Sequence, residues 1–313
     1  MRYRALFLGS NNIVPIATMR SWLGAGHEIA SFWRPATPTG GAVRRDRRRA
    51  WILPRCSATA IAGKHGFPIR DVSRLATWPD AVDAARATGA DVLISAFFRY
   101  VIPTGMLDLF GDRAVNFHPA PLPRFRGPAP IHAMVLDRSI LTDGAMTIHV
   151  LAPGLDEGPI VAQEQLAFPA DMTIHSYEIA LAQASARMAA GVLPQFFDGD
   201  IKAVPQDEGA ATYVRTMRHE LDLSIDQTAD EIRWRCATFA KSHPLKIVGI
   251  DDGLAIGFVS IVGPPSGLSP AIGPFTIDFD AADARVRVRR KLPFTRQFRT
   301  LRDFYKLAKA SVD

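Results

Sequence analysis

The sequence has little cysteine and no long apolar run. Its two cysteines, Cys56 and Cys236, lie far apart and in no spacing typical of a metal site, so they read as ordinary thiols of a reducing compartment. No uninterrupted apolar stretch reaches the roughly 18 residues of a membrane-spanning helix. The apolar run at residues 3–9 is too short for a secretory signal. We therefore expect a cytoplasmic protein without a membrane partner.

Several chemical motifs are also missing. The first strand-like run ends in Gly9-Ser10-Asn11, which is not the Gly-x-Gly-x-x-Gly pattern of a dinucleotide site. No Ser-His or Cys-His arrangement indicates a covalent nucleophile, and no metal site is expected. No repeat is visible.

The composition is that of a globular protein. The 313 residues are 48% hydrophobic and 22% charged, which is compatible with one large domain or two. The formal net charge is +6 and the pI is near 9.6. This balance favours partners that carry phosphates, such as nucleic acid or nucleotides.

The order of strand-like and helix-like segments predicts two parts. A strand, a helix at 14–24 and a second strand at 27–33 form a β-α-β unit, which predicts a mainly parallel, doubly wound α/β sheet. Further helices are expected at 58–66, 78–88, 129–136 and 173–193, and residues 34–55 are expected to be an arginine-rich loop. After a boundary near residue 208, a helix at 226–239 and short strands at 246–251, 254–262, 275–279 and 285–289 predict a small β-barrel. A basic helix is expected after Lys291.

One stretch, residues 115–127, carries the chemistry. Asn116 and His118 are two residues apart, so on an extended segment their side chains point to the same face. An amide can donate to an oxyanion, and an imidazole exchanges protons near neutral pH. Asp156 lies on the turn 153–158, where its carboxylate can orient the imidazole or take a proton through water. The set suits acyl or one-carbon transfer to an amine.

These residues also carry a resemblance. Asn116, His118, Leu122-Pro123 and Gly127, followed by Gly154-Leu155-Asp156-Glu157-Gly158, resemble the signature of the 10-formyltetrahydrofolate-dependent formyltransferases. The resemblance implies a formyltransferase-like α/β domain at 1–208 and a smaller β-rich, OB-like domain at 209–313. It implies 10-formyltetrahydrofolate as the formyl donor. Asn116, His118 and Asp156 are then the catalytic residues.

The resemblance also implies binding residues. The residues expected to contact the donor are Phe97, Arg99, Ile102, Leu122, Pro123, Gly127, Gly154 and Leu155. The residues expected to contact the acceptor are Ser10, Asn11, Asn12, Arg44 and Arg45. Arg124 and Arg126, which flank Phe125 in the loop, are expected either to contact an anionic acceptor as well or to pair with surface carboxylates. The arginines suit an anionic acceptor, because a guanidinium binds phosphate well.

The acceptor is open at this point. A nucleotide-linked amino sugar or another small amine is the first expectation, because Cys236-Ala237-Thr238-Phe239 departs from the Arg-Ala pair and Trp-rich continuation of the tRNA enzymes. Methionyl-tRNA is the second, because of the arginines and the pI. A non-catalytic folate- or nucleotide-binding protein and a formyltetrahydrofolate hydrolase remain as alternatives. The oligomeric state is not indicated.

Overall fold

The structure is a computed structural model that describes residues 1–36, 41–168, 173–215, 218–239, 245–250 and 256–290. Seven strands form one sheet in the order β3-β2-β1-β4-β5-β6-β7. The first five pair in parallel, whereas β6 runs antiparallel to β5 and β7 antiparallel to β6. The strands are β1 (Arg4–Gly9), β2 (Glu28–Pro35), β3 (Ile69–Val72), β4 (Val92–Ala96), β5 (Ala114–His118), β6 (Ala145–Val150) and β7 (Ile160–Gln165).

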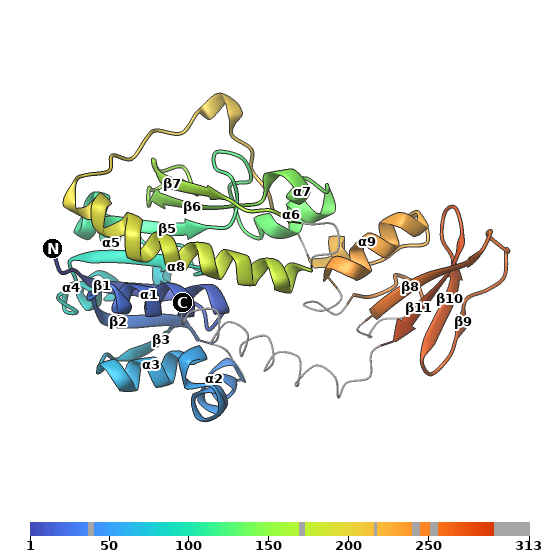
Figure 1. Cartoon of the computed structure of the whole chain (residues 1–313), viewed down its shortest axis with the longest axis horizontal. Coiled ribbons are helices and arrows are strands. Elements are labelled where there is room, and N and C mark those ends of the chain that lie inside the picture. The colour runs from blue at the N-terminus through green and yellow to red at the C-terminus, as the bar shows by residue number, and fades with distance from the viewer. Residues whose placement is uncertain (37–40, 169–172, 216–217, 240–244, 251–255, 291–313) are drawn as a thin grey trace.

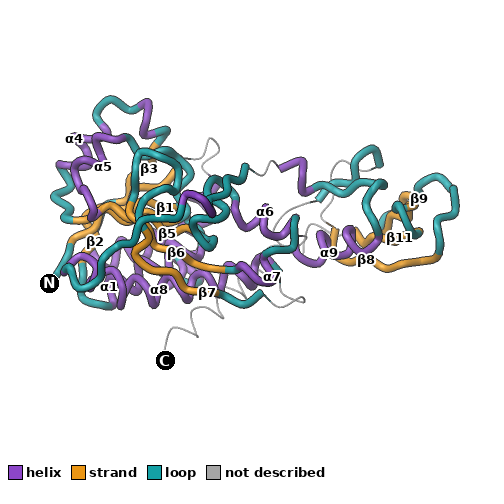
Figure 2. Tube along the Cα trace, turned by 90° about the horizontal axis from the view of Figure 1, so that it is seen from above, coloured by secondary structure: helices purple, strands orange, loops and turns teal. Residues whose placement is uncertain are grey.

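Helices cover both faces of this sheet (Figure 2). The alternation of β1 shows why: Ala5 and Phe7 belong to one buried apolar cluster, and Leu6 and Leu8 belong to another. The first cluster is completed by α1 (Ile13–Gly24), α3 (Ala58–His65) and α8 (Ile174–Asp198). The second is completed by α4 (Ala81–Arg86) and α5 (Thr104–Phe110). A sheet buried on both faces is the doubly wound arrangement.

The C-terminal part is a separate antiparallel sheet beside the large one (Figure 1). Its strands have the order β8-β11-β10-β9. Helix α9 connects the two parts: the Trp234 indole donates to the Val135 carbonyl at 2.8 Å, and Arg138 pairs with Asp230 and Glu231. The elements are α6 (Pro130–Leu136), α7 (Ile140–Asp143), α9 (Ala229–Phe239), β8 (Ile256–Gly263), β9 (Ala271–Ile272), β10 (Thr276–Asp280) and β11 (Arg285–Arg290).

The predicted fold class, a doubly wound and mainly parallel sheet with a smaller β-rich part, is confirmed. Two local predictions are wrong. The expected loop at 34–55 contains the helix α2 (Gly41–Ile52), because arginine and alanine are good helix formers and the Pro/Gly signals end before it. Residues 246–250 form a single bridge at Ile247 and then a turn instead of a strand. The tail helix expected after Lys291 lies outside the described residues.

Short 3-10 turns join several of these elements, at Pro54–Cys56, Leu75–Thr77, Gly111–Arg113, Glu208–Ala210 and Arg218–Leu221. The predicted domain boundary at residue 208 falls in the fourth of them. Within the described residues, no helix combines the length and hydropathy that crossing a bilayer requires.

Candidate active site

The chemistry-bearing residues lie at one edge of the large sheet. Gly9 pairs with Ala96, and Ala96 pairs with Phe117, so β1, β4 and β5 end side by side. The segments that follow these three strands are therefore neighbours. In open α/β sheets ligands bind beyond the carboxyl ends of such strands. Asn116 and His118 are in the last three residues of β5 and project to the same face.

Asp156 reaches these residues from the loop between β6 and β7. One carboxylate oxygen, Oδ2, accepts a hydrogen bond from the Gly127 amide at 2.9 Å and lies 3.6 Å from His118 Nδ1. The other, Oδ1, lies 3.5 Å from His149 Nε2. The structure thus brings Asn116, His118 and Asp156 into one cluster, together with one further histidine.

The added residue is His149. It lies directly opposite Asn116 in the antiparallel pairing of β5 with β6, and its ring is fully buried. Nδ1 lies 2.9 Å from the Val150 carbonyl, which can only accept, so Nδ1 carries the proton. Nε2 is then free to accept from the Asn116 amide nitrogen at 3.2 Å. This bond fixes the amide orientation and leaves the second N–H of Asn116 for another acceptor.

His118 is buried, with 4% of its surface exposed. Its Nε2 lies 2.9 Å from the Phe125 carbonyl and must donate to it, which turns Nδ1 toward Asp156. Burial holds the pKa of His118 below its ordinary value, although the Asp156 carboxylate acts in the opposite direction. A largely neutral imidazole at neutral pH is suited to accept a proton.

Asp156 stays ionised despite its position. Burial alone would raise the pKa of its carboxyl, but contact with the protonated form of His149, the charge of protonated His118 and the Gly127 amide together lower the pKa to about 2. The carboxylate can therefore stabilise a proton on His118 without being protonated itself.

The backbone around the cluster is unusual. In the described part of the chain, five non-glycine residues have a positive φ, and four of them, Phe97, Phe125, Ala129 and Asp156, belong to the segments that form this edge. Each such residue costs about 1–3 kcal/mol and persists only where neighbours hold it. Gly127 also has a positive φ of 111°, and a Cβ there would lie 2.3 Å from the Val214 carbonyl. The local geometry is therefore held by contacts and not by backbone preference.

The predicted donor contacts lie along the same edge, on the segments after β4 and β5 and on the Asp156 turn. Phe97 is half-buried, Ile102 packs on the α4–α5 side, and Leu155 is 51% exposed. Leu122 is buried before a cis peptide bond to Pro123, and Gly154 lies against the Glu157 carboxylate. Arg99 instead bonds the Ala36 carbonyl at 3.1 Å and the Tyr100 hydroxyl at 2.8 Å.

Of the predicted acceptor contacts after β1, Asn11 is tied to α2. Asn12 caps α1 and also donates to Glu178, while Ser10 accepts from the Asn12 amide. Asn11 receives hydrogen bonds from Arg34 on its side chain and from Arg49 on its carbonyl. The bond from Arg49 attaches α2 to the turn beside the candidate site.

The α2 helix exposes positive charge and buries its negative charge. Its acidic residue, Asp46, is fully buried and neutralised by Arg34 at 3.2 Å. Four arginines on the helix are exposed, and Trp51 is 88% exposed. The exposed arginines are Arg44, Arg45, Arg47 and Arg48.

The other two predicted arginines make internal contacts. Arg124 pairs with Asp143 at 2.6 Å and is still partly exposed. Arg126 is fully buried, and its guanidinium bonds Gln206, Glu208 and Tyr213. Its nitrogens are therefore occupied by partners within the protein, and the structure does not bring it to an acceptor.

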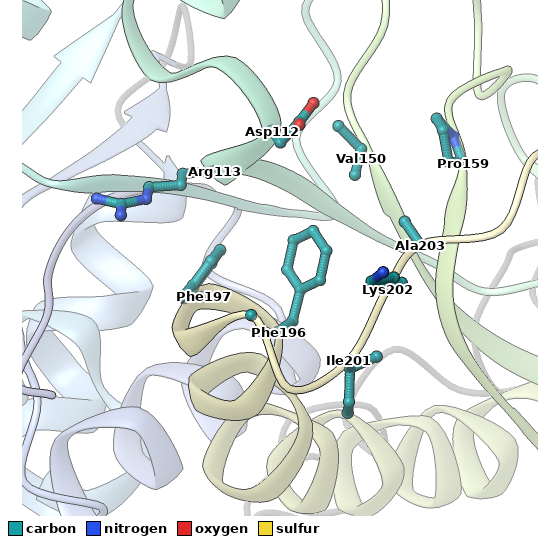
Figure 3. Close-up of a pocket in the computed structure, with 10 residues that line it drawn as sticks. Asp112, Arg113, Val150, Pro159, Phe196, Phe197, Ile201, Lys202 and Ala203 are labelled. Atoms are coloured by element: carbon teal, nitrogen blue, oxygen red, sulfur yellow. The ribbon is translucent and has the colours of Figure 1, made fainter.

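A cavity of about 470 Å³ lies elsewhere, beside the start of β5 (Figure 3). Phe196, Phe197 and Ile201 from the end of α8 and beyond line one side of it, and Asp112 and Arg113 lie on the other. His118 ends β5, so this cavity is at the opposite edge of the sheet from the cluster. None of the predicted site residues lines it.

Known proteins are similar to this chain in sequence. A family model described as "Formyl transferase" matches residues 65–193. A methionyl-tRNA formyltransferase of Chloroflexus aggregans is 31% identical over 230 residues, which are 73% of this chain and 70% of that protein. A methionyl-tRNA formyltransferase of Moorella thermoacetica is 29% identical over 81% of this chain and 82% of that protein. The chain belongs to the formyl transferase family, and the enzyme class expected from its sequence is confirmed.

The fold has solved counterparts as well. WlaRD, a sugar 3N-formyl transferase solved in the presence of dTDP and 5-N-formyl-THF, superposes with a TM-score of 0.64 at 15% identity. The superposition covers 93% of this chain and 100% of that one. This likeness concerns the fold alone.

Proposed function

We propose that the protein transfers a formyl group from 10-formyltetrahydrofolate to the primary amine of an acceptor that carries phosphate. The observation that carries this proposal is the cluster of Asn116, His118 and Asp156 at the carboxyl edge of the sheet, with both histidines within 3.6 Å of the carboxylate. Family membership fixes the group transferred. The cluster supplies a hydrogen-bond donor, a base and a fixed negative charge, which are the groups that amine formylation needs.

In the proposed reaction the amine nitrogen bonds to the formyl carbon, and the bond from this carbon to N10 of the folate breaks. The second N–H of Asn116 stabilises the oxyanion that forms on the formyl oxygen. His118 takes the proton lost by the amine, directly or through water, and returns it for the leaving N10. Asp156 stabilises the imidazolium in between. His149 holds the Asn116 amide in its orientation and touches no reacting atom.

The donor site is proposed along the segments 97–102, 122–127 and 154–155. A pterin is flat, with apolar faces and polar edges, so it suits backbone donors and acceptors set between apolar side chains. Val101 and Leu155 are 70% and 51% exposed on two of these segments and offer apolar surface for the ring. WlaRD, named above, was solved with a formyl-THF, which supports the same class of donor.

For the acceptor, we propose methionyl-tRNA first. Relatives with this name match most of the chain, at 29% to 31% identity for the two described above. The exposed arginines of α2, fixed to the turn after β1 through Asn11, provide a cationic surface beside the site. Trp51 at the end of α2 offers a ring on which a base can stack. This order reverses the one expected from the sequence.

A nucleotide-linked amino sugar is the second candidate. The observation in its favour is the segment Cys236–Phe239 at the end of α9, which departs from the tRNA enzymes. The same α2 arginines would then bind one diphosphate instead of a nucleic-acid backbone.

The salt dependence of acceptor affinity distinguishes a tRNA acceptor from an amino-sugar acceptor. The test measures formyl transfer to methionyl-tRNA and to a panel of nucleotide-linked amino sugars, for the wild type and for an Arg44→Ala/Arg45→Ala variant. With tRNA, we expect a strong loss of affinity with salt, and the double variant should weaken the logarithmic salt slope by about 0.7–0.9 for each phosphate contact removed. An Arg74→Ala/Arg86→Ala variant, which loses the same charge at exposed positions outside α2, is the control. Transfer to an amino sugar alone would replace the first candidate by the second.

A further inference from the structure

The segment that leaves α8 and leads toward the C-terminal sheet passes through the candidate active site. It contributes Gln206, a buried side chain whose amide is fully used. The amide nitrogen donates to the Asp156 carbonyl at 2.8 Å and to the Gly158 carbonyl at 2.7 Å. The amide oxygen accepts from Arg126 Nε at 3.1 Å and Nη2 at 2.9 Å. An amide has two N–H donors and two lone pairs, so all four positions are occupied.

The backbone of the Asp156 turn has a conformation that neighbouring residues must stabilise. Asp156 has a φ of 55°, in the left-handed region that side chains other than glycine rarely adopt. Its carboxylate reaches His118, His149 and Gly127 only while this conformation lasts. Gln206 binds the carbonyl of Asp156 itself and that of a residue two positions later. The turn is therefore fixed at its backbone by a residue that is 50 positions away in the sequence.

Gln206 is itself held in place. The fully buried Arg126 donates hydrogen bonds to the amide oxygen of Gln206 and also forms an ion pair with Glu208 at 2.7 Å. The Tyr213 hydroxyl accepts from Arg126 at 2.8 Å and donates to Glu157 at 2.7 Å, so the linker contacts the same turn a second time. Backbone bonds from the Arg126 amide to the Thr212 carbonyl and from the Val214 amide to the Arg126 carbonyl complete the attachment.

We propose that Gln206 is a positioning residue for the proposed formyl transfer, acting through the backbone of Asp156 to keep its carboxylate beside His118. Arg126, expected from the sequence to bind the acceptor, holds Gln206 in this role. A kinetic test of this inference, the kcat of Gln206 variants, rests on the proposed function. A spectroscopic test, the pKa of His118, depends on the geometry alone. It also makes the linker at 206–214 part of the catalytic machinery.

Two substitutions distinguish the role of the Gln206 amide nitrogen, which donates to the turn, from that of the amide oxygen, which accepts from Arg126. Gln206→Met keeps length and neutrality and removes every hydrogen bond. Gln206→Glu keeps the acceptor for Arg126, but its carboxylate cannot donate to the carbonyls of Asp156 and Gly158. Both variants should lose about tenfold to a hundredfold in kcat, the range for misplaced catalytic groups, with KM for both substrates near that of the wild type. Tm should fall less in Gln206→Glu, because Arg126 stays paired.

The control is Gln227→Glu. Gln227 also donates to a backbone carbonyl, that of Asp222, and accepts from a backbone amide, that of Ser224, but it lies at the start of the C-terminal part. Wild-type kcat is expected there. A wild-type kcat in Gln206→Glu would show that Gln206 acts only as a support for Arg126 and would overturn the proposal.

The spectroscopic test needs no substrate. The pKa of His118 is measured by NMR of histidine-labelled protein, with His118→Asn to assign the signal. The groups that face this ring are the Asp156 carboxylate, His149 and the Phe125 carbonyl. Displacement of Asp156 removes a charge that favours protonation, so Gln206→Met should lower the pKa of His118 toward its value in Asp156→Asn.

The outcomes are distinct. A lowered pKa of His118 in Gln206→Met supports the positioning role even if no acceptor is formylated, which would count against the proposed function only. An unchanged pKa of His118 in Gln206→Met contradicts the positioning role, whatever the wild type transfers.

Discussion

The replacement Asp156→Asn gives the sharpest prediction for stability. Asparagine imitates the protonated acid in size and can still accept from the Gly127 amide. The variant therefore isolates the charge of a carboxylate whose side chain is only 12% exposed. The ordinary pKa of 3.8 falls to about 2 in the folded protein. At about 1.36 kcal/mol per pKa unit, the charge contributes about 2.4 kcal/mol to the free energy of unfolding while His118 is protonated, and less near neutral pH, where His118 is largely neutral.

The pH dependence follows from the direction of this pKa. Because the folded pKa lies below the unfolded one, the contribution is complete above about pH 4 and is lost as the pH falls toward 2. Near pH 3 about half of it should remain, roughly 1.2 kcal/mol. Urea unfolding of the wild type and of Asp156→Asn across this range measures the difference at each pH. The reasoning would be refuted if the wild type had no larger free energy of unfolding than Asp156→Asn just above about pH 4, or if this difference did not shrink as the pH falls toward about 2.

Three further predictions concern the same cluster. His118→Asn should lower kcat at least about a hundredfold while Tm stays close to that of the wild type, as measured by formyl transfer and thermal unfolding. The acid limb of the profile of kcat/KM against pH should have its midpoint below 6.5, because burial lowers the pKa of His118; a midpoint above 6.5 would contradict this. Gly127→Ala should lower both Tm and activity, because its Cβ would meet the Val214 carbonyl at 2.3 Å. Gly191→Ala, on α8 with nothing within 4 Å, is the control and should raise stability slightly.

Much of the fold could be predicted because its signals are local. The β-α-β start and the helices expected after it are readable from apolar spacing, and they yield the doubly wound sheet. The helix α2 was missed because its arginines were read for their charge, whereas their helix propensity decides the local structure.

The candidate site was predictable only in part. Asn116 and His118 share a strand, so their common face follows from spacing. The role of His149 depends on the register of β5 with β6, which pairs it with Asn116 and which no local pattern specifies. Arg126 was assigned to the acceptor because an arginine in a loop suggests an anion. Its partners, Gln206 and Glu208, come from a linker 80 or more positions away and are visible only in three dimensions.

The most direct test of the central claim is a single-turnover assay with 10-formyltetrahydrofolate and methionyl-tRNA or an amino-sugar acceptor. It follows the N-formylated product by mass spectrometry in the wild type, in Asn116→Ala and in His118→Ala. The account predicts rapid product formation in the wild type and a loss of at least about a hundredfold in each variant, with all three proteins equally folded. Transfer by either variant at the wild-type rate would contradict it.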